Sequence, residues 1–142
     1  KGNPPVVGFP EVERLLSIRN DTVYILNFWA TWCVPCVKEL PAFQQLHEKY
    51  ADRNFRMILL SLDFRKDYHS RLLPFLQEKQ LKPEVWLLYE PDANSWIPKV
   101  DEKWTGSIPA TLILHRGERL FFEAQLSYDE LESVVKPYLK KL

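Results

Sequence analysis

The sequence predicts an α/β fold in which a central mixed β-sheet is flanked by helices on both faces. Strand-like apolar runs alternate with helix-like amphipathic runs along the chain, and two closing strand-like runs are followed by one more helix. The run over 22–28 is rich in β-branched and aromatic residues and lacks polar alternation, which is typical of a strand buried on both faces. A length of 142 residues fits one domain, which we expect to span 1–142.

The first half of the chain contains three predicted strands and two predicted helices. Pro10 suits a helix start, because its missing N–H would be unpaired there in any case. Pro41 lies inside an apolar stripe of helical spacing that continues beyond it, so we expect a kink rather than a helix end. The elements are a short edge strand at 6–7, a helix over 11–19, a strand over 22–28, a helix over 37–50 and a strand over 55–62.

The second half is predicted to complete the sheet and cover it. The stretch over 90–103 is interpreted as an embellishment within the domain, with a short helix over 94–100 that Pro98 breaks. Ser127 and Glu130 have the spacing of a capping box, which opens a last helix whose apolar face extends to Leu142. The other elements are a helix over 67–79, a strand over 85–89 and a hairpin of strands over 111–115 and 119–123.

Composition excludes several functional classes. Lysine plus arginine and aspartate plus glutamate number 19 each, so charge gives no reason to expect nucleic acid or an anionic membrane as a partner. No apolar run approaches the roughly 18 residues of a membrane span, and no signal-like start is present. The opening residues 1–5 resemble the stub of a processed chain, so any leader or lipid anchor is expected to lie outside this sequence.

The only two cysteines, Cys33 and Cys36, lie where the central strand gives way to a helix. A bridge across so short a loop removes little entropy from the unfolded chain, so stability is not its expected purpose. The unpaired N–H groups of a helix N-terminus stabilise a thiolate, and Pro35 presets the first turn. We therefore expect Cys33 to be the accessible nucleophile of disulfide exchange and Cys36 the shielded cysteine that resolves the mixed disulfide.

Other interpretations of the cysteine pair are weaker. The two residues could be small core hydrophobes. Zinc generally needs four ligands, but the chain has no second cysteine pair, and its three histidines match no finger spacing, so no metal site is predicted. Copper(I) handling by the two sulfurs and a non-catalytic binding module remain alternatives. A peroxidase is disfavoured because Thr31 lies too close to the first cysteine.

The residues over 27–36, together with Pro41 and the run over 108–111, resemble the thioredoxin superfamily. Within it the chain is most similar to the TlpA/ResA-like thiol–disulfide oxidoreductases of bacteria, and the stretch over 91–97 resembles the TlpA-like proteins of Bacteroidetes. The similarity spans about 11–142. It implies a thioredoxin-like fold.

The resemblance also implies roles for residues around the dithiol. Pro109 is expected to be a cis-proline that faces the cysteines and keeps metal from binding between them. Ile108 is expected to offer its backbone to an extended segment of the substrate. Trp32, with Val34 and Pro35 between the cysteines, is expected to contact the substrate.

The identity of the proton acceptor is open. Thioredoxins carry a buried aspartate where this chain has Asn27. TlpA/ResA-like proteins often share the asparagine and use an acidic residue after the next strand. Asp63 is the nearest acidic residue there, although Phe64 occupies the aligned position, and Glu39 is a second candidate.

The predicted function is a thiol–disulfide oxidoreductase that reduces protein disulfides. Its dithiol is the redox group, so no separate cofactor is expected. Val34 and Pro35 supply no cation to stabilise the thiolate further, which favours a reducing protein. By resemblance we expect a monomer that works outside the cytoplasm, in the periplasm or anchored to a membrane, and that is recharged by a membrane electron donor or a thioredoxin-like reductant. Apocytochrome c maturation and general disulfide isomerisation are both open.

Overall fold

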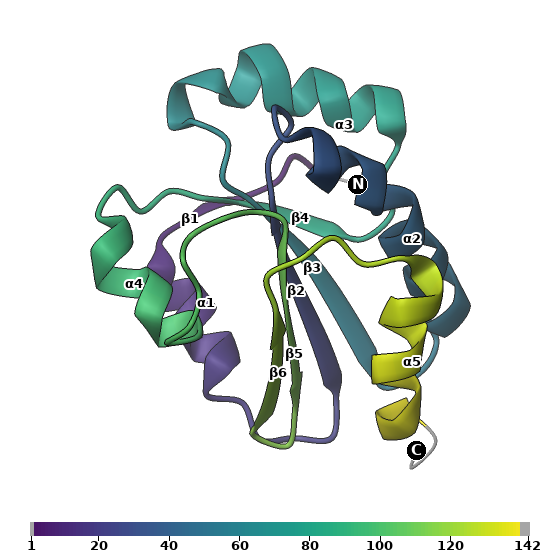
Figure 1. The fold of residues 1–142 in the computed structure, drawn as a ribbon. Helices are drawn as coiled ribbons and strands as arrows, with labels where there is room; N and C mark the ends of the chain where they lie inside the picture. Colours follow the sequence, from purple (N-terminus) through teal and green to yellow (C-terminus); the bar gives the residue numbers. More distant parts are fainter. Residues whose placement is uncertain (1, 140–142) are drawn as a thin grey trace.

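A computed structural model describes residues 2–139, which form one mixed sheet of six strands covered by helices (Figure 1). The order across the sheet is β1-β4-β3-β2-β5-β6. The first four strands in this order run parallel to one another. Strand β5 is antiparallel to β2, and β6 is antiparallel to β5. The strands are β1 (Val6–Val7), β2 (Val23–Trp29), β3 (Phe55–Ser61), β4 (Glu84–Leu88), β5 (Ala110–His115) and β6 (Glu118–Phe122).

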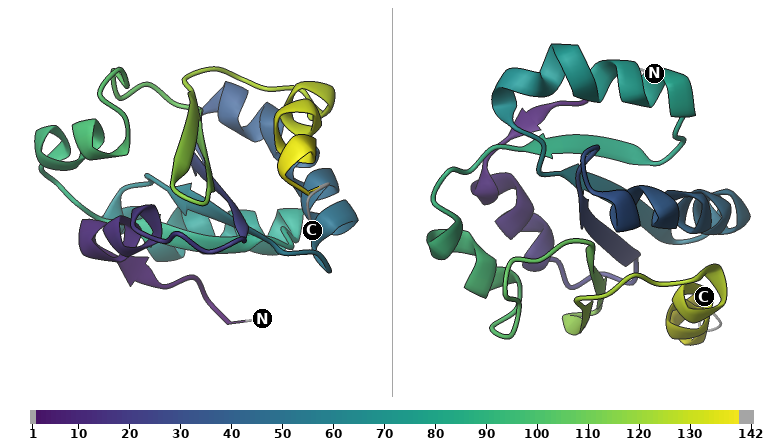
Figure 2. Two further views of the ribbon diagram at one scale, coloured as in Figure 1. Left: turned by 90° about the horizontal axis from the view of Figure 1, so that it is seen from below. Right: turned by 45° about the horizontal axis from the view of Figure 1, so that its top comes forward.

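The helices divide between the two faces of the sheet (Figure 2). The helices α1 and α4 pack on one face, and α2, α3 and α5 pack on the other. Their bounds are α1 (Phe9–Leu16), α2 (Val34–Tyr50), α3 (Leu73–Lys79), α4 (Ala93–Val100) and α5 (Tyr128–Leu139). The predicted α/β architecture, with a mixed sheet between two helical layers, is confirmed.

Strand β2 is the centre of the sheet, and all seven of its residues are buried. Because successive side chains of a strand point to opposite faces, Ile25 and Trp29 enter the core beneath α2 and α5, while Leu26 and Phe28 enter the core beneath α1 and α4. Both faces of this strand are covered by helices, as the absence of polar alternation in its sequence predicts.

Two helices begin earlier than predicted. α1 starts at Phe9 rather than at 11, because Gly8 is its N-cap and the carboxylate of Glu11 accepts a hydrogen bond from the Gly8 N–H at 3.0 Å. It ends at Leu16, three residues before the predicted end. α2 starts at Val34 rather than at 37, because Cys33 is its N-cap. The helix continues past Pro41, as expected.

The predicted helix over 67–79 is wrong in its first half. A 3₁₀ turn (Arg65–Asp67) and a π-helical turn (Tyr68–Leu72) precede α3, and only 73–79 is α-helical. Pro74 lies in the first turn of α3, where a missing N–H costs least, so the wider turn precedes it. The prediction that Pro98 breaks its helix is also wrong, since α4 continues to Val100, which is buried.

The closing elements agree with the sequence patterns. The hairpin of β5 and β6 forms, with bounds shifted by one residue. Ser127 and Glu130 make the predicted capping box, because each backbone N–H donates to the other side chain, at 2.9 and 3.1 Å. The apolar face of α5 is buried through Leu139, and Leu142 lies outside the described residues. No helix in the described part of the chain is both long and apolar enough to span a membrane.

Candidate functional site

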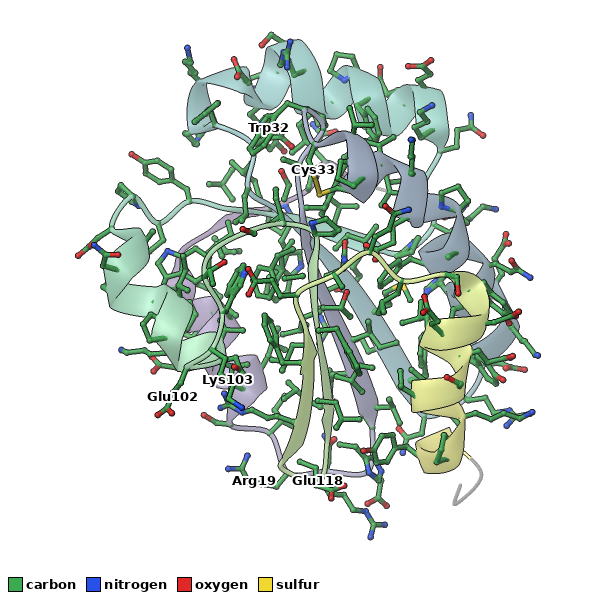
Figure 3. The ribbon with its side chains drawn as sticks, viewed as in Figure 1. Arg19, Trp32, Cys33, Glu102, Lys103 and Glu118 are labelled. Carbon is green, nitrogen blue, oxygen red and sulfur yellow. A yellow bond between two sulfur atoms is a disulfide. The ribbon has the colours of Figure 1, made fainter. Side chains whose placement is uncertain are left out.

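Cys33 and Cys36 form a disulfide at the end of the sheet where β2 leads into α2 (Figure 3). Their Cα atoms are 5.2 Å apart. Cys36 is completely buried, as expected for the resolving cysteine. The bridge therefore lies at the junction that the sequence indicates, at the carboxyl end of the central strand.

The first turn of α2 is built around the sulfur of Cys33. Cys33 is the N-cap residue, and its Sγ accepts a hydrogen bond from the backbone N–H of Cys36 at 3.3 Å. Pro35 lies in the first turn, where it removes no helical hydrogen bond. The positive end of the helix dipole and an N–H donor thus converge on one sulfur, which is the environment that favours a thiolate.

The prediction of an accessible Cys33 is wrong for this disulfide form, because the residue is only 6% exposed. Its Sγ lies 3.7 Å from the carbonyl oxygen of Ile108, on the loop before β5, and is bonded to the buried Cys36. The adjacent side chains are open to solvent instead, with Trp32 48% exposed and Val34 63% exposed. The bridge therefore lies just beneath an exposed apolar rim.

The loop that contacts Cys33 contains the predicted cis-proline. The peptide bond between Ile108 and Pro109 is cis, so this prediction is confirmed. Pro109 is buried and Ile108 half-buried. The chain thus brings Ile108 to the bridge, close to the rim residues Trp32, Val34 and Pro35, from a segment some 75 positions away. Their roles in substrate binding stay predictions.

Glu39 lies one turn beyond Cys36 on α2, and its carboxyl group is buried in the core. One oxygen accepts a hydrogen bond from the side-chain amide of Asn27 at 3.2 Å, and the other accepts from the backbone N–H of Leu126 at 2.6 Å. Burial raises the pKa of Glu39 to about 7, and these two hydrogen bonds, which lower the pKa, offset only part of that effect. Residues three apart share a helix face, so this carboxyl group is on the side of Cys36.

Asn27 occupies the centre of this buried polar group. Its amide nitrogen donates to Glu39, to the hydroxyl of Thr111 at 3.1 Å and to the carbonyl of Ala110 at 3.4 Å. An amide does not titrate, so Asn27 itself supplies no base. It positions the carboxyl group of Glu39, which does titrate near neutral pH.

Asp63 is buried just after β3, and its carboxylate is saturated by hydrogen bonds. It accepts from the backbone N–H of Thr31 at 3.1 and 3.2 Å, from the Thr31 hydroxyl at 2.6 Å and from the Ser61 hydroxyl at 2.6 Å. Thr31 lies two residues before Cys33. Asp63 therefore ties the loop that carries the nucleophile to the neighbouring strand.

The contacts of Thr31, Ser61 and Leu126 were not predicted from the sequence. The bond between Thr31 and Asp63 joins residues 32 positions apart, and the bond between Glu39 and Leu126 joins residues 87 positions apart. No local pattern encodes either contact. The one usable signal is the polar pair Ser61 and Asp63, which follows the apolar run over 57–60.

Metal coordination finds no support in the arrangement of side chains. Within residues 2–139, no group of three or more His, Cys, Asp or Glu side chains is placed to hold a metal ion. The copper-handling alternative needs the two sulfurs of Cys33 and Cys36 as free thiolates, and in this structure they are joined in a disulfide.

Comparisons with known proteins identify the family of the chain. The model of the family described as AhpC/TSA matches residues 12–117. Thiol-disulfide oxidoreductase ResA of Bacillus thuringiensis is 47% identical over 117 residues, which cover 82% of this chain and 61% of that protein. The chain thus spans less than two thirds of the length of this curated relative.

Solved structures establish the fold. A thioredoxin-related protein from Neisseria meningitidis serogroup B has a TM-score of 0.72 and 24% identity, covering 87% of this chain and 89% of that chain. A thiol:disulfide interchange protein of the thioredoxin family from Chlorobium tepidum has a TM-score of 0.69 and 22% identity, covering 89% and 84%. The predicted thioredoxin-like fold is confirmed by these likenesses.

Proposed function

The chain belongs to the AhpC/TSA family, and from this premise we propose that it is a thiol–disulfide oxidoreductase that reduces protein disulfides through Cys33 and Cys36. One observation carries the proposal. The two cysteines form a disulfide at the N-terminus of α2, with the Cys36 N–H directed at the Cys33 sulfur. The similarity to ResA supports the same chemistry.

The reaction starts from the reduced dithiol. The Cys33 thiolate attacks one sulfur of a substrate disulfide, and the other substrate sulfur leaves as a thiolate and takes up a proton. Cys36 then loses its proton and attacks Cys33, which re-forms the bridge between 33 and 36 and releases the second substrate thiol. Two electrons pass to the substrate in each cycle. A membrane electron donor or a thioredoxin-like reductant must then return two electrons to the bridge.

Residues around the bridge are proposed to hold the substrate. Trp32, Val34 and Pro35 are exposed beside Cys33, and the Ile108 carbonyl lies against its sulfur. An extended segment of the partner that pairs with the backbone at Ile108 would bring its own sulfur to Cys33. Pro109 holds this loop at the site.

We propose Glu39, rather than Asp63, as the group that takes the Cys36 proton. Glu39 follows Cys36 by one helical turn, and its pKa of about 7 suits a base that works near neutral pH. The carboxylate of Asp63 already accepts hydrogen bonds from Thr31 and Ser61, so we assign it the structural role of holding the loop.

The proposal extends to the setting of the reaction. The dithiol suffices as the redox group, so no separate cofactor is required, and nucleic acid has no role. The resemblance to TlpA/ResA-like proteins supports action outside the cytoplasm, on disulfide-containing proteins, by a monomer in one domain.

The direct test is to trap the covalent intermediate. With Cys36→Ser, the second step is blocked, so mixed disulfides between Cys33 and its partners should accumulate in the native host and be captured under non-reducing conditions. Cys33→Ser is the matched control, because it keeps one buried thiol but removes the nucleophile. Equal adducts in the two variants, or none in either, would contradict the assigned division of labour.

A further inference from the structure

The sheet has two edges, β1 and β6, and only one of them is blocked against a further strand. β1 is two residues long, and Pro4 and Pro5, which precede it, have no N–H to offer a neighbouring strand. β6 has five residues and no proline, and within residues 2–139 it pairs with β5 alone (Figure 1). An open edge of this length is a template for another strand.

The hairpin of β5 and β6 shows which backbone groups face the open edge. Its two turn residues have φ angles of 51° and 87°, and His115 and Glu118 flank them as a register pair. In a two-residue hairpin of this type the flanking residues bond to each other, and every second residue of each strand then bonds across the pair. The N–H and C=O groups of Arg119 and Phe121 therefore point away from β5, and the same alternation continued by one step includes Glu123.

Two opposite charges are held in place along this edge. The guanidinium group of Arg119 donates to the carbonyl oxygens of Lys99 and Val100, both at 3.0 Å. The carboxylate of Glu123 accepts hydrogen bonds from the hydroxyl and, at 3.1 Å, the N–H of Thr105, and these bonds lower the pKa of Glu123. Both groups are thus charged at neutral pH, and neither has an ionic partner within residues 2–139.

A hollow of about 750 Å³ lies beside the outer face of β6. Arg119, Phe121 and Glu123 line it from the strand, and residues 98–103 line it from the end of α4 and the loop that follows. The ring of Phe121 packs on that of Trp104, with centroids 5.7 Å apart, yet Phe121 is only half-buried. These three side chains of the edge therefore share one face and have free space next to them.

The sequence of β6 favours one register of pairing with an identical strand. With Phe121 on the two-fold axis of an antiparallel pair, Arg119 of each copy lies opposite Glu123 of the other, and Leu120 lies opposite Phe122. Moving the axis by one residue places a charged side chain opposite the Phe121 ring. Moving it by two residues places Arg119 opposite Arg119 or Glu123 opposite Glu123, and like charges in this position are destabilising.

We propose that β6 is an interaction surface for a second copy of this chain, which pairs with it antiparallel about Phe121 and forms two ion pairs between Arg119 and Glu123. Charges on an edge strand usually oppose pairing, but in this register they are complementary. The contact exchanges about six backbone hydrogen bonds. It is smaller than a permanent interface, so the dimer forms only at high concentration.

The inference goes beyond the proposed function and does not depend on it. The dithiol lies at the carboxyl end of β2, and β5 separates that strand from β6. Each copy in the dimer therefore keeps its own dithiol, and a single chain remains the reacting unit.

Charge reversal tests the register. Sedimentation equilibrium of the oxidised protein, whose bridge between 33 and 36 is intact, should show monomers at about 10 µM and dimers increasing toward about 1 mM. Arg119→Glu and Glu123→Arg each place like charges opposite one another, so each should weaken the dimer at least about tenfold. An equimolar mixture of the two single variants should associate as the wild-type protein does, because opposite charges face each other again in the mixed dimer.

A third variant is the matched control. Glu118→Arg changes the net charge as much as Glu123→Arg, but position 118 lies opposite Ala124 in this register, so the dimer should keep its stability. Dimers that all variants form equally would place the contact elsewhere and overturn the inference, as would a wild-type protein that stays monomeric at 1 mM. A mixture that associates no better than the single variants also overturns it, provided that each variant unfolds at the wild-type temperature.

Hydrogen exchange of the wild-type protein gives a measurement without any substitution. The amides of Arg119 and Phe121, which face the open edge, should become protected as the protein concentration rises, whereas the amide of Leu120, which bonds to β5, should be protected throughout. Dimers that leave the exchange of Arg119 and Phe121 unchanged would contradict this surface. Protection of both amides in the monomer would show that another part of the same chain occupies the edge, and it would overturn the inference as well.

Discussion

The two faces of the sheet are made by the same strands, yet different kinds of side chains are buried against them. Beneath α1 and α4 the buried side chains form an apolar cluster whose aromatic rings contact one another, with Trp96 stacked on Phe9 and Phe28. The opposite face, with α2 and α5, carries the buried disulfide. It also accounts for the buried polar or charged side chains of residues 2–139, which are Asn27, Glu39, Ser61, Asp63, Thr111 and His115.

The indole groups show the same difference. The N–H of Trp96 donates to the carbonyl of Glu90 at 3.2 Å, and that of Trp104 donates to the carbonyl of Ser107 at 2.8 Å. On the other face, the buried indole N–H of Trp29 has no hydrogen-bond partner in the described part of the chain. Both of these indole groups on the apolar face are thus paired, whereas the face of the dithiol tolerates a buried unpaired group that costs stability, as functional sites often do.

Truncating the apolar face should have the largest effect on stability. Trp96→Ala removes a ring that is 4% exposed and contacts three other rings, so we expect the free energy of unfolding to fall by about 3–5 kcal/mol. Urea denaturation measures this loss. Because Trp96 lies on the face opposite the dithiol, we expect the folded fraction of this variant to reduce oxidised glutathione at the same rate as the wild-type protein.

Trp96→Phe is the matched control. It keeps an aromatic ring but removes the hydrogen bond to Glu90, so the loss should be smaller than for alanine. A change in the redox potential of the dithiol in either variant, at a pH where both are folded, would show that the two faces are not independent.

Glu39→Gln should have the next largest effect on the free energy of unfolding, and the size of this effect should depend on pH. The pKa of Glu39 is about 7 in the folded protein against an ordinary value near 4.5, so between these values the folded state binds more protons than the unfolded state. The free energy of unfolding of the wild-type protein therefore falls as pH rises from about 4.5 to about 7, by roughly 3 kcal/mol from this group. The glutamine variant should lack that fall.

Activity gives the second measurement of the Glu39 variant. If Glu39 accepts the Cys36 proton, the rate at which the mixed disulfide resolves should rise in the wild-type protein as pH passes about 7, and in Glu39→Gln this rise should move to higher pH. Glu39→Asp is a control that keeps the carboxyl group but shortens it. Identical pH–rate profiles in the wild-type protein and the glutamine variant would leave Glu39 with a structural role alone.

The order of the elements could be predicted because it depends on periodicity. The run over 22–28 is apolar at nearly every position, and it serves both cores. The residues at which the helices begin were harder to predict than the order of the elements. α2 begins at Val34 because the sulfur of Cys33 accepts the capping hydrogen bond, and cysteine is not an ordinary N-cap residue. The π-helical turn over 68–72 likewise depends on packing around Pro74 rather than on local preference.

The residues of the candidate site show the same difference between features that a local sequence pattern predicts and features that depend on tertiary contacts. Cys33, Cys36 and the cis-proline Pro109 follow from short motifs, because adjacent residues carry the signal. Glu39 and Asp63 were both visible as acidic residues, but their environments were not. The raised pKa of Glu39 comes from burial, and its partner Leu126 approaches only when the chain folds. The sequence therefore names the candidate acids, and tertiary contacts give the two carboxyl groups different environments.

Asp63→Asn should have the smallest of these effects on stability and a selective one on the site. The amide keeps one acceptor oxygen for Thr31 but replaces the other by a donor, which then faces the donors of Thr31 and Ser61. We expect a loss of about 1–3 kcal/mol in the free energy of unfolding. Because Thr31 precedes the rim residue Trp32, the loop should also loosen, and the reduction of oxidised glutathione should slow without the pH shift predicted for Glu39→Gln.

Ser61→Ala is the matched control, since it removes one hydrogen bond to Asp63 but leaves the hydrogen bonds between Asp63 and Thr31 in place. A pH profile displaced by Asp63→Asn and not by Glu39→Gln would reverse the two assignments, and Asp63 would then be the base.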